Sequence, residues 1–487
     1  MISSGRALSR SWRHTLRHAA SLSQYLTRSV PPVLRRREGC GGHDADRMPV
    51  RASGTRRAHV NASTGRGSMN RRLADAALLA YARLLRRFER VPAATAQVER
   101  VVIFSALGPG LRAGDHIAAS IAFELVARRF PGAELHLVTT AFQAGKFHDL
   151  YLLHMPIDRL IVCDDPAFGR WRNWLRLLRG LRAARYDACV HDSRDTRLSP
   201  LFAHLCGIGR RFGLQRGLAV DAFVNQGQIA LSGAWGAMTL LDMAQAYARA
   251  LAFDPPLPRE RIDPRFRLAP VDRPLAFSGR RPIIVVHPGG SRDWNRRWPD
   301  AHYQVLCEQL LRRYHAQIVL VGGDDESDEA QQLVDRVRER CSDGELRQAC
   351  GGDLNWMAQH VAQADLVVGN DSSVMHIAGC LGVPAVIMFG PTPYSTWDAY
   401  RNQTSVSLEL DCWRHRPTLH RDAVAACSRD CPVEYDPALR RYPHCMTGLS
   451  VEAVFDACER KLAAGGRRDG RDGRDASSVA GTAADPA

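Results

Sequence analysis

Four polar residues stand close together in the segment GNDSSVMHIAGCLGVPAVIMFGPT. Asp371 closes an apolar run that predicts a strand, and Ser372 and Ser373 open the helical pattern that follows. The backbone N–H groups and the dipole at a helix start favour an anion, and His376 shares this face one turn later. The group suits a diphosphate with an attached sugar. Simple helix capping by Asp371 or Ser372, with His376 in the core, explains the pattern equally well.

A second group occupies the stretch HPGGSRDWNRRWP. Gly289 and Gly290 allow a close approach of the backbone to a ligand, and Ser291 offers a hydroxyl. Arg296 and Arg297 carry fixed positive charge, and an arginine can bind phosphate oxygens in a bidentate manner. The alternative is a solvated basic loop that leads into the next helix, and we expect one of the two arginines to do only that.

Acidic side chains follow two further glycine-containing loops. In VGGDDESDE, Glu326 is the preferred partner of ribose hydroxyls, with Asp324 and Asp325 as alternatives and an exposed acidic helix start as the plainer explanation. In SALGPGLRAGDHIAAS, Asp115 stands at the start of a helix and could take a proton from an attacking hydroxyl. Helix capping is the commoner role for such an aspartate.

Four cysteines lie in the polar stretch 411–445. They are Cys412, Cys427, Cys431 and Cys445, and four thiolates can hold a structural zinc ion in tetrahedral geometry. Two close CxxC pairs are absent, so free or transiently paired thiols are the alternative. The chain has 13 cysteines, many of them within strand or helix patterns, which suits a reducing cytoplasm and argues against a disulfide framework.

Apolar runs alternate with helical patterns in two blocks, which predict two α/β domains over residues 96–265 and 275–464. Strands separated by helices imply parallel sheets with crossover helices, and ligands bind at the carboxyl ends of such strands. A stretch rich in Pro and Arg at 254–274 is expected to connect the domains. The strand-and-loop segments are 98–108, 134–140, 159–163 and 186–193 in the first block and 281–290, 316–325, 364–373 and 383–392 in the second. The helical patterns that stand out are 117–130 and 301–314.

The two ends of the chain differ from these blocks. Residues 1–68 are rich in Arg, Ser and Gly and are expected to be a disordered extension or part of an over-long gene model, with Met69 as an alternative start. Residues 69–95 predict a basic amphipathic helix that either lies on an anionic membrane surface or packs on its own protein. Residues 465–487 are expected to be a disordered tail. The predicted apolar face of the helix comprises Leu73, Ala77, Tyr81, Leu84, Leu85 and Phe88.

The net charge of +15 does not indicate a nucleic-acid binder. Residues 1–100 hold 20 Arg and 6 acidic residues, whereas the remaining 387 residues are nearly neutral, with 46 basic and 45 acidic residues. No run approaches the roughly 20 apolar residues that a membrane-spanning helix needs. The body of the chain is therefore expected to bind no nucleic acid and to span no membrane.

Taken together, these segments resemble glycosyltransferase family 9, the ADP-heptose:lipopolysaccharide heptosyltransferases, over about residues 98–460. NDSSVMHIAGCLGVPAVIMFGPTP resembles the family's DSGxxH…LGVPxxxLFGPT signature, and HPGGS…RRWP resembles HPGAS…KRWP. SALG…GDHI resembles the N-terminal S-x-L-G-D-hydrophobic motif, and residues 186–213 resemble the family's YD…D…R…A…GA..R.G stretch.

The resemblance implies a GT-B fold, in which two Rossmann-like domains face a cleft and bind the acceptor and the donor, respectively. It implies an inverting, metal-independent transfer that requires no cofactor. Asp115 would be the general base, and Arg296 would neutralise the leaving diphosphate in place of the family's Lys. Glu326 would hold the ribose. The donor diphosphate and sugar would be lined by Gly289, Gly290, Ser291, Asp371, Ser372, Ser373 and His376.

The implied partners are a nucleotide-diphospho-sugar donor such as ADP-heptose and a lipid-linked oligosaccharide acceptor. The implied location is cytoplasmic and peripheral, at the inner face of the inner membrane. The sequence departs from the family pattern in an inserted GPGLRA before Gly114, in Ser373 where the family has Gly, and in Arg296. A nucleotide-sugar 2-epimerase of similar architecture and a non-catalytic nucleotide-sugar binder are therefore kept as alternatives.

Overall fold

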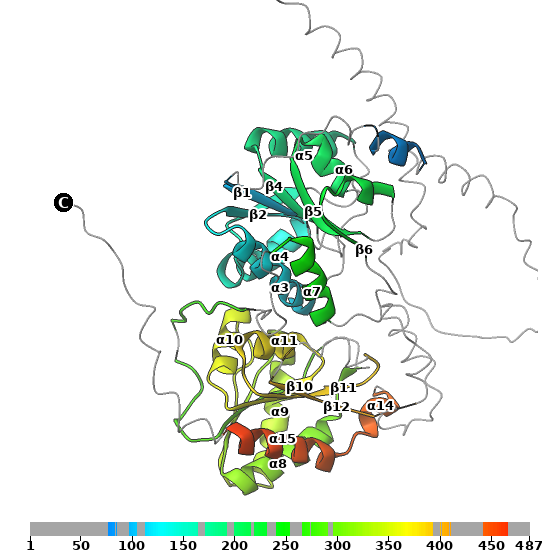
Figure 1. The fold of residues 1–487 in the computed structure, drawn as a ribbon. Coiled ribbons are helices and arrows are strands. Elements are labelled where there is room, and N and C mark those ends of the chain that lie inside the picture. The colour runs from blue at the N-terminus through cyan, green and yellow to red at the C-terminus, as the bar shows by residue number, and fades with distance from the viewer. Residues whose placement is uncertain are drawn as a thin grey trace, which may run out of the picture.

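The strands of the computed structural model form two six-stranded parallel sheets among the residues it describes (Figure 1). In the described residues, a helix lies between each pair of successive strands from β1 to β11, as the alternation in the sequence predicts. The described residues are 76–82, 84, 97–104, 113–163, 171–191, 199–215, 219–230, 240–253, 265–272, 274–290, 296–392, 400, 402–408, 410 and 442–465.

The first sheet has the strand order β3-β2-β1-β4-β5-β6. Its strands are β1 (Arg100–Phe104), β2 (Glu134–Thr140), β3 (Arg159–Cys163), β4 (Ala188–His191), β5 (Arg210–Gln215) and β6 (Gln226–Ala230). Its helices are α3 (Ala113–Arg129), α4 (Ala141–His154), α5 (Trp171–Ala184), α6 (Ser199–Leu205), the 3₁₀ helix η1 (Ala219–Phe223) and α7 (Leu240–Ala250). Ile117, Ile121, Leu125 and Phe130, the periodic positions of the first predicted helix, are all buried.

The second sheet has the strand order β12-β11-β10-β7-β8-β9. Its strands are β7 (Ile283–His287), β8 (Gln317–Leu320), β9 (Glu345–Gln348), β10 (Leu366–Asn370), β11 (Ala385–Phe389) and β12 (Gln403–Ser407). Its helices are α8 (Asp300–Tyr314), η5 (Asp324–Glu326), α9 (Ser327–Arg338), α10 (Leu354–Ala362), α11 (Ser373–Leu381), α14 (His444–Thr447) and α15 (Val451–Gly465). Strands β7, β8, β10 and β11 are buried at every position, as expected where helices cover both faces of a parallel sheet.

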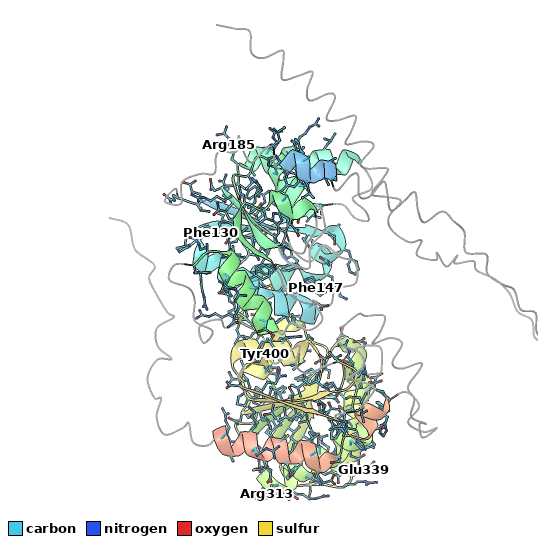
Figure 2. All side chains as sticks on the ribbon, turned by 45° about the vertical axis from the view of Figure 1, so that its right-hand side comes forward. Phe130, Phe147, Arg185, Arg313, Glu339 and Tyr400 are labelled. Atoms are coloured by element: carbon cyan, nitrogen blue, oxygen red, sulfur yellow. The ribbon has the colours of Figure 1, made fainter. Side chains whose placement is uncertain are left out.

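The two domains meet through α3 of the first and α11 of the second. Ile117 and Phe123 belong to the same buried apolar cluster as Met375 and Ile377, so the hydrophobic core continues across the boundary. Figure 2 shows Phe147 at the end of the first domain that faces the second, and Tyr400 at the facing end of the second. This apolar contact limits the relative movement of the two domains.

Residues 265–272, within the predicted connection, contact both domains. The ring of Phe266 stacks on His154 of α4, with 4.4 Å between the centroids. The backbone of Ala269 exchanges hydrogen bonds with the side-chain amide of Asn355 on α10, at 3.0 Å in each direction. The connecting chain is therefore fixed on one side to the first domain and on the other to the second.

The N-terminal helix is described at residues 76–82 and 84. The Tyr81 ring lies 6.4 Å from His204 and 6.2 Å from Phe223, so this part of the helix packs beside α6 and η1. Ala82 is buried because its small side chain allows a close approach.

The side of this helix that packs on the protein carries the buried Ala82 and the half-buried Leu78, which do not belong to the predicted apolar face. Three members of the predicted face are exposed instead, namely Ala77, Tyr81 and Leu84. None of the helices in the described ranges combines the length and the apolarity that crossing a bilayer requires.

Candidate functional site

The candidate site lies where the connections of the second sheet diverge. His287 ends β7 and Asn370 ends β10, and these strands are neighbours with Gly369 paired to His287. The next strand after β7 is β8, on one side of it, whereas the next strand after β10 is β11, on the opposite side of β10. Such a divergence opens a crevice at the carboxyl ends of the strands, where α/β proteins bind their ligands.

Helix α11 begins at this crevice. Ser372 is its N-cap residue, but the Ser372 side chain makes no capping hydrogen bond. Its Oγ lies 3.0 Å from Nδ1 of His287 instead. Ser372 and Ser373 are both half-buried, so the helix start and its hydroxyls can reach a ligand. The free N–H groups and the dipole of this helix start favour an anionic group.

Asp371 and His376 flank this helix start and are both buried. Asp371 Oδ2 lies 3.3 Å from a guanidinium nitrogen of Arg296, so the aspartate orients the arginine. Nδ1 of His376 lies 2.9 Å from the hydroxyl of Tyr400, a residue without a signal in the sequence. Both predicted residues are thus at the crevice, and each is held by a neighbouring side chain.

The two consecutive arginines have different surroundings. The Arg297 side chain is 8% exposed and pairs with Glu329 at 2.8 Å and with Glu326 at 3.5 Å. The Arg296 side chain is 25% exposed and lies beside the helix start that carries Asp371. Arg297 therefore serves the internal packing of the domain, and Arg296 supplies accessible positive charge at the crevice.

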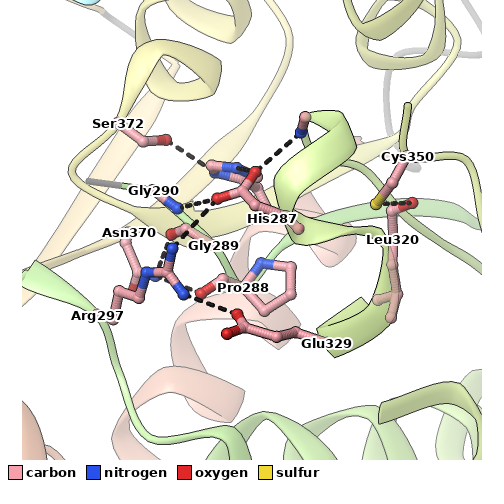
Figure 3. Close-up of polar contacts among 12 residues, drawn as sticks. His287, Pro288, Gly289, Gly290, Arg297, Leu320, Glu329, Cys350, Asn370 and Ser372 are labelled. Atoms are coloured by element: carbon pink, nitrogen blue, oxygen red, sulfur yellow. Dashed lines mark hydrogen bonds and ion pairs between the residues drawn. The ribbon is translucent and has the colours of Figure 1, made fainter. Parts of the chain in front are cut away.

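Glu326 ties the loop after β7, whose Gly290 is labelled in Figure 3, to the loop after β8. Its Oε1 accepts a hydrogen bond from the N–H of Gly290 at 2.6 Å, and its Oε2 accepts one from the N–H of Gly323 at 2.9 Å. Nε2 of His287 lies 3.3 Å from Oε2. Burial opposes ionisation of this carboxyl, but the hydrogen bond and charge of His287 and the two N–H groups lower its pKa to about 2.

Gly289 is required by this carboxylate. A Cβ atom at position 289 would stand 2.0 Å from Oε1 of Glu326, so any other residue there would push the carboxylate out of its hydrogen bond to Gly290. Gly290 has a φ of 136°, a conformation that glycine adopts readily. The two glycines therefore give the loop the shape that lets the Glu326 carboxylate accept a hydrogen bond from it.

His287 and Asn370 are parts of the site that the motif analysis does not single out. The Asn370 amide donates to the carbonyls of Pro288 and Gly289 at 2.8 Å each. Its oxygen accepts hydrogen bonds from the Trp298 N–H and the Tyr303 hydroxyl, at 3.0 Å each. The sequence feature that could have identified them as site residues is their position, because each is the last residue of a buried strand.

Asp115 lies in the first turn of α3 and is half-buried. The residue before it, Gly114, contacts His376, because a Cβ at position 114 would stand 3.0 Å from Cδ2 of that ring. The start of α3 thus meets the start of α11, and Asp115 belongs to the same junction as the polar residues of the second domain.

The remaining predicted site residues are only partly described. Ser291, Cys412, Cys427 and Cys431 lie outside the described residues. Cys445 is buried in α14, within the apolar core of the second domain. Among the residues that the structure describes, no three His, Cys, Asp or Glu side chains converge as metal ligands.

Comparison with known proteins identifies the relatives of this chain. The family model of glycosyltransferase family 9 (heptosyltransferase) matches residues 174–425, slightly more than half of the chain. Lipopolysaccharide heptosyltransferase 2 of Salmonella typhimurium is 27% identical over 289 residues, which are 57% of this chain and 80% of that protein. Lipopolysaccharide heptosyltransferase 1 of Pseudomonas aeruginosa is 26% identical over 370 residues, which are 72% of this chain and 96% of that protein.

Solved structures show the same fold. The E. coli ADP-heptose lipopolysaccharide heptosyltransferase II superposes with a TM-score of 0.51 and 17% identity, covering 75% of this chain and 99% of that one. A family 9 glycosyltransferase from Veillonella parvula gives a TM-score of 0.51 and 16% identity, covering 76% and 98%. The predicted fold class, two Rossmann-like α/β domains of the GT-B type, is confirmed.

Proposed function

Because the chain belongs to glycosyltransferase family 9 and is a glycosyltransferase, we propose that it moves a heptose from ADP-heptose onto the core of a lipopolysaccharide. The heptosyltransferases of Salmonella typhimurium and Pseudomonas aeruginosa support the sugar and the acceptor class. The observation that carries the proposal is the junction of the two helix starts, where Gly114 contacts His376. This junction brings a candidate base and a candidate diphosphate site together across the domain boundary.

The proposed reaction is a single displacement with inversion at the anomeric carbon. Asp115 takes the proton of the acceptor hydroxyl while its oxygen attacks the anomeric carbon of the donor sugar. The bond from that carbon to the diphosphate oxygen breaks, and the electron pair leaves with ADP. The base and the leaving group lie on opposite sides of the sugar in this scheme, as an in-line attack requires.

The leaving diphosphate is stabilised by preorganised positive charge, and no metal ion is required in this proposal. Arg296 supplies a full charge held by Asp371, and the start of α11 supplies N–H groups and its dipole. Ser372 and Ser373 add hydroxyl donors on the same side. Glu326 is proposed to reach the ribose from its place below the Gly289–Gly290 loop, and the carboxylate orients that loop at the same time.

We further propose that the protein works at the inner face of the inner membrane, where its lipid-linked acceptor is made. The arginine-rich segment 69–95, which the sequence predicts to be a helix, carries charge suited to an anionic bilayer. Flotation with anionic vesicles, comparing the full chain with a variant lacking residues 69–90, tests this step. Equal flotation of both proteins would contradict it.

A structural zinc ion held by Cys412, Cys427, Cys431 and Cys445 is a separate proposal. Metal analysis of the purified protein should give about one zinc per chain, and Cys427→Ser should remove it. Cys163→Ser is the control, because Cys163 lies in the first domain and donates to the carbonyl of Thr139. A wild-type protein without zinc would end this proposal.

The function is tested with ADP-heptose and the truncated lipid-linked core from cells that lack the gene. The wild type should add one heptose with inverted anomeric configuration, in the presence of EDTA, as mass and NMR spectra of the product can show. Asp115→Asn should lower the rate at least about a hundredfold, in line with the loss of a general base. Asp149→Asn, on the exposed side of α4, is the matched control and should keep the wild-type rate.

Other outcomes would separate the alternatives. Consumption of the nucleotide sugar without any acceptor would favour an epimerase. Binding of ADP-heptose without transfer to any core acceptor would favour a non-catalytic binder. Loss of activity in EDTA that added divalent cations restore would contradict the metal-independent mechanism.

A further inference from the structure

Three side chains that are far apart in the sequence form a continuous chain of contacts beside the start of α11, and Figure 3 shows two of them, Ser372 and His287. Ser372 Oγ lies 3.0 Å from Nδ1 of His287, and Nε2 of the same ring lies 3.3 Å from Oε2 of Glu326. His287 is 3% exposed, whereas Ser372 is half-buried. The ring in the middle of this chain is therefore shielded from the crevice, and the Ser372 hydroxyl reaches it.

The charge of Glu326 decides which ring nitrogen of His287 carries a proton. With a pKa of about 2, the Glu326 carboxylate is ionised at neutral pH and can only accept hydrogen bonds. Nε2 must then be protonated. Nδ1 has two states: a neutral ring accepts the hydroxyl proton of Ser372, and a charged ring donates to Ser372 Oγ.

In the two states, the Ser372 hydroxyl offers different hydrogen-bonding groups to the crevice. When the ring is neutral, the serine proton points at Nδ1, and only oxygen lone pairs are left for a ligand. When the ring is charged, Oγ accepts from Nδ1, and the serine proton is free to point outward. The phosphate oxygens of a nucleotide sugar only accept hydrogen bonds, so they bind the second state better.

We propose that His287 is a positioning residue that turns the Ser372 hydroxyl toward the donor diphosphate, and that donor binding takes up one proton on Nδ1 of His287. The inference rests on the proposed function, since it requires a diphosphate at the start of α11. The proton remains on the ring while ADP is bound and returns to solvent when ADP leaves. His287 itself touches neither the sugar nor the reacting atoms.

Charged groups of both signs lie around His287. The ring lies between Glu326, which favours its charged form, and the Ser372 hydroxyl, and its backbone carbonyl accepts a hydrogen bond from Tyr303. Arg297 lies one contact further out, 3.5 Å from the Glu326 carboxylate and 2.8 Å from Glu329, and Arg296 pairs with Asp371 at the crevice. A diphosphate esterified at both ends brings two negative charges and favours protonation of the ring.

Calorimetry of ADP-heptose binding tests the proposal. ADP-heptose is a suitable probe because its diphosphate diester keeps the same charge across the neutral pH range. Titrations in two buffers of different ionisation enthalpy measure the protons taken up, and the wild type should take up close to one where free His287 is neutral. Over that range the affinity should fall by up to about tenfold for each unit of pH, the limit for one linked proton.

Two variants and one control locate the proton. His287→Asn places a permanent N–H donor near Ser372 but cannot titrate, so its donor affinity should lose this pH dependence and the associated proton uptake. Ser372→Ala keeps the ring and removes the hydroxyl, so the uptake should decrease and the affinity should fall. His148→Asn is the control, because His148 is an exposed histidine on α4 paired with Asp149, and it should match the wild type.

The outcomes are distinguishable. Binding without proton uptake in the wild type would overturn the inference and leave the proposed function standing. Wild-type uptake that persists in a folded His287→Asn protein would assign the proton to another group and would also overturn it. If His287→Asn does not fold, the comparison of the wild type with Ser372→Ala decides. Failure to bind ADP-heptose at any pH would overturn the donor assignment, and this inference with it.

Discussion

Gly114 of α3 lies directly against His376 of α11, although the two residues belong to different domains. A Cβ atom at position 114 would stand 3.0 Å from Cδ2 and 3.4 Å from Nε2 of the His376 ring, and 3.6 Å from Cα of Ser373. The absence of a side chain at Gly114 therefore sets how closely the start of α3 approaches the start of α11. Asp115 follows immediately in the chain and takes its position from the same contact.

Gly114→Ala should slow sugar transfer more than it weakens donor binding. The added methyl group pushes His376 and the two helix starts apart by a few tenths of an ångström, which misplaces the base relative to the sugar. We expect kcat to fall about tenfold, because small displacements of reacting groups carry large rate penalties. Steady-state kinetics with ADP-heptose and the lipid-linked acceptor measure the change.

Gly145→Ala is the matched control for this substitution. Gly145 is a helical glycine of α4, and a Cβ there meets nothing within 4 Å. Its transfer rate should equal that of the wild type. Equal rates for Gly114→Ala and Gly145→Ala would show that the contact with His376 does not position the base.

Replacing the two neighbouring arginines should have different effects. Arg296→Ala should lower kcat by about a hundredfold or more, because it removes charge from the leaving group. Arg297→Ala should lower the unfolding free energy by about 3 kcal/mol, because it removes a buried guanidinium that pairs with both Glu326 and Glu329. Urea denaturation and kinetics on both variants, with Arg296→Lys as the charge-preserving control, distinguish the roles. An Arg296→Ala variant that keeps the wild-type kcat would contradict them.

Tyr400→Phe should release the ring of His376 without changing the packing around it. The tyrosine hydroxyl lies 2.9 Å from Nδ1 of His376, and the aromatic ring is buried. We expect a several-fold loss of kcat and a loss of about 1 kcal/mol in unfolding free energy, the usual contribution of one hydrogen bond. Tyr314→Phe removes a hydroxyl that binds Glu459 far from the crevice and should leave kcat unchanged. A kcat loss of equal size in both variants would mean that the His376 contact has no special role.

Glu326 should make the stability of the protein depend on pH in the acidic range. Its pKa of about 2 in the folded protein lies below the ordinary value of 4.5, so folding favours the ionised form. The stabilisation is complete above about pH 5 and is lost as the pH falls toward 2, and it amounts to about 3 kcal/mol.

The measurement is the urea midpoint between pH 7 and pH 3. Glu326→Gln should be less stable than the wild type at pH 7, and the gap should narrow as the pH falls. Glu329→Gln, an exposed partner of the same Arg297, is the control and should show a smaller change. A pH-independent gap between Glu326→Gln and the wild type would contradict the role of the charge.

The central strands of both sheets could be predicted from the sequence because burial on both faces leaves an apolar run. RVVIF, ELHLVTT, IIVVH and AVIMF carry that pattern. The edge strands β9 (ELRQ) and β12 (QTSVS) carry few apolar residues and are incompletely buried, so no periodic signal marks them. These two segments become strands because they pair with the neighbouring strands β8 and β11, and their own residues do not indicate this.

The sequence could predict some features of the candidate site and not others. Residues that follow a buried strand, such as Asp371 and Glu326, could be selected because the fold class places strand ends at the ligand. Their individual partners could not be predicted. His287 precedes Ser372 by 85 residues, and their contact exists only because β7 and β10 are neighbours in the sheet. The distinction between Arg296 and Arg297 likewise depends on the direction in which each side chain leaves the loop.

The segment that joins the two domains does more than connect them. Phe266 is stacked on His154, and Ala269 is hydrogen-bonded to Asn355, so this segment is attached to both domains. A flexible tether would leave each domain free to sample many orientations, and the substrates would bear the entropic cost of selecting one. In this protein, folding already restricts the relative orientation of the domains. Less of the free energy of substrate binding is therefore used to order the domains, and more of it can lower the barrier of the chemical step.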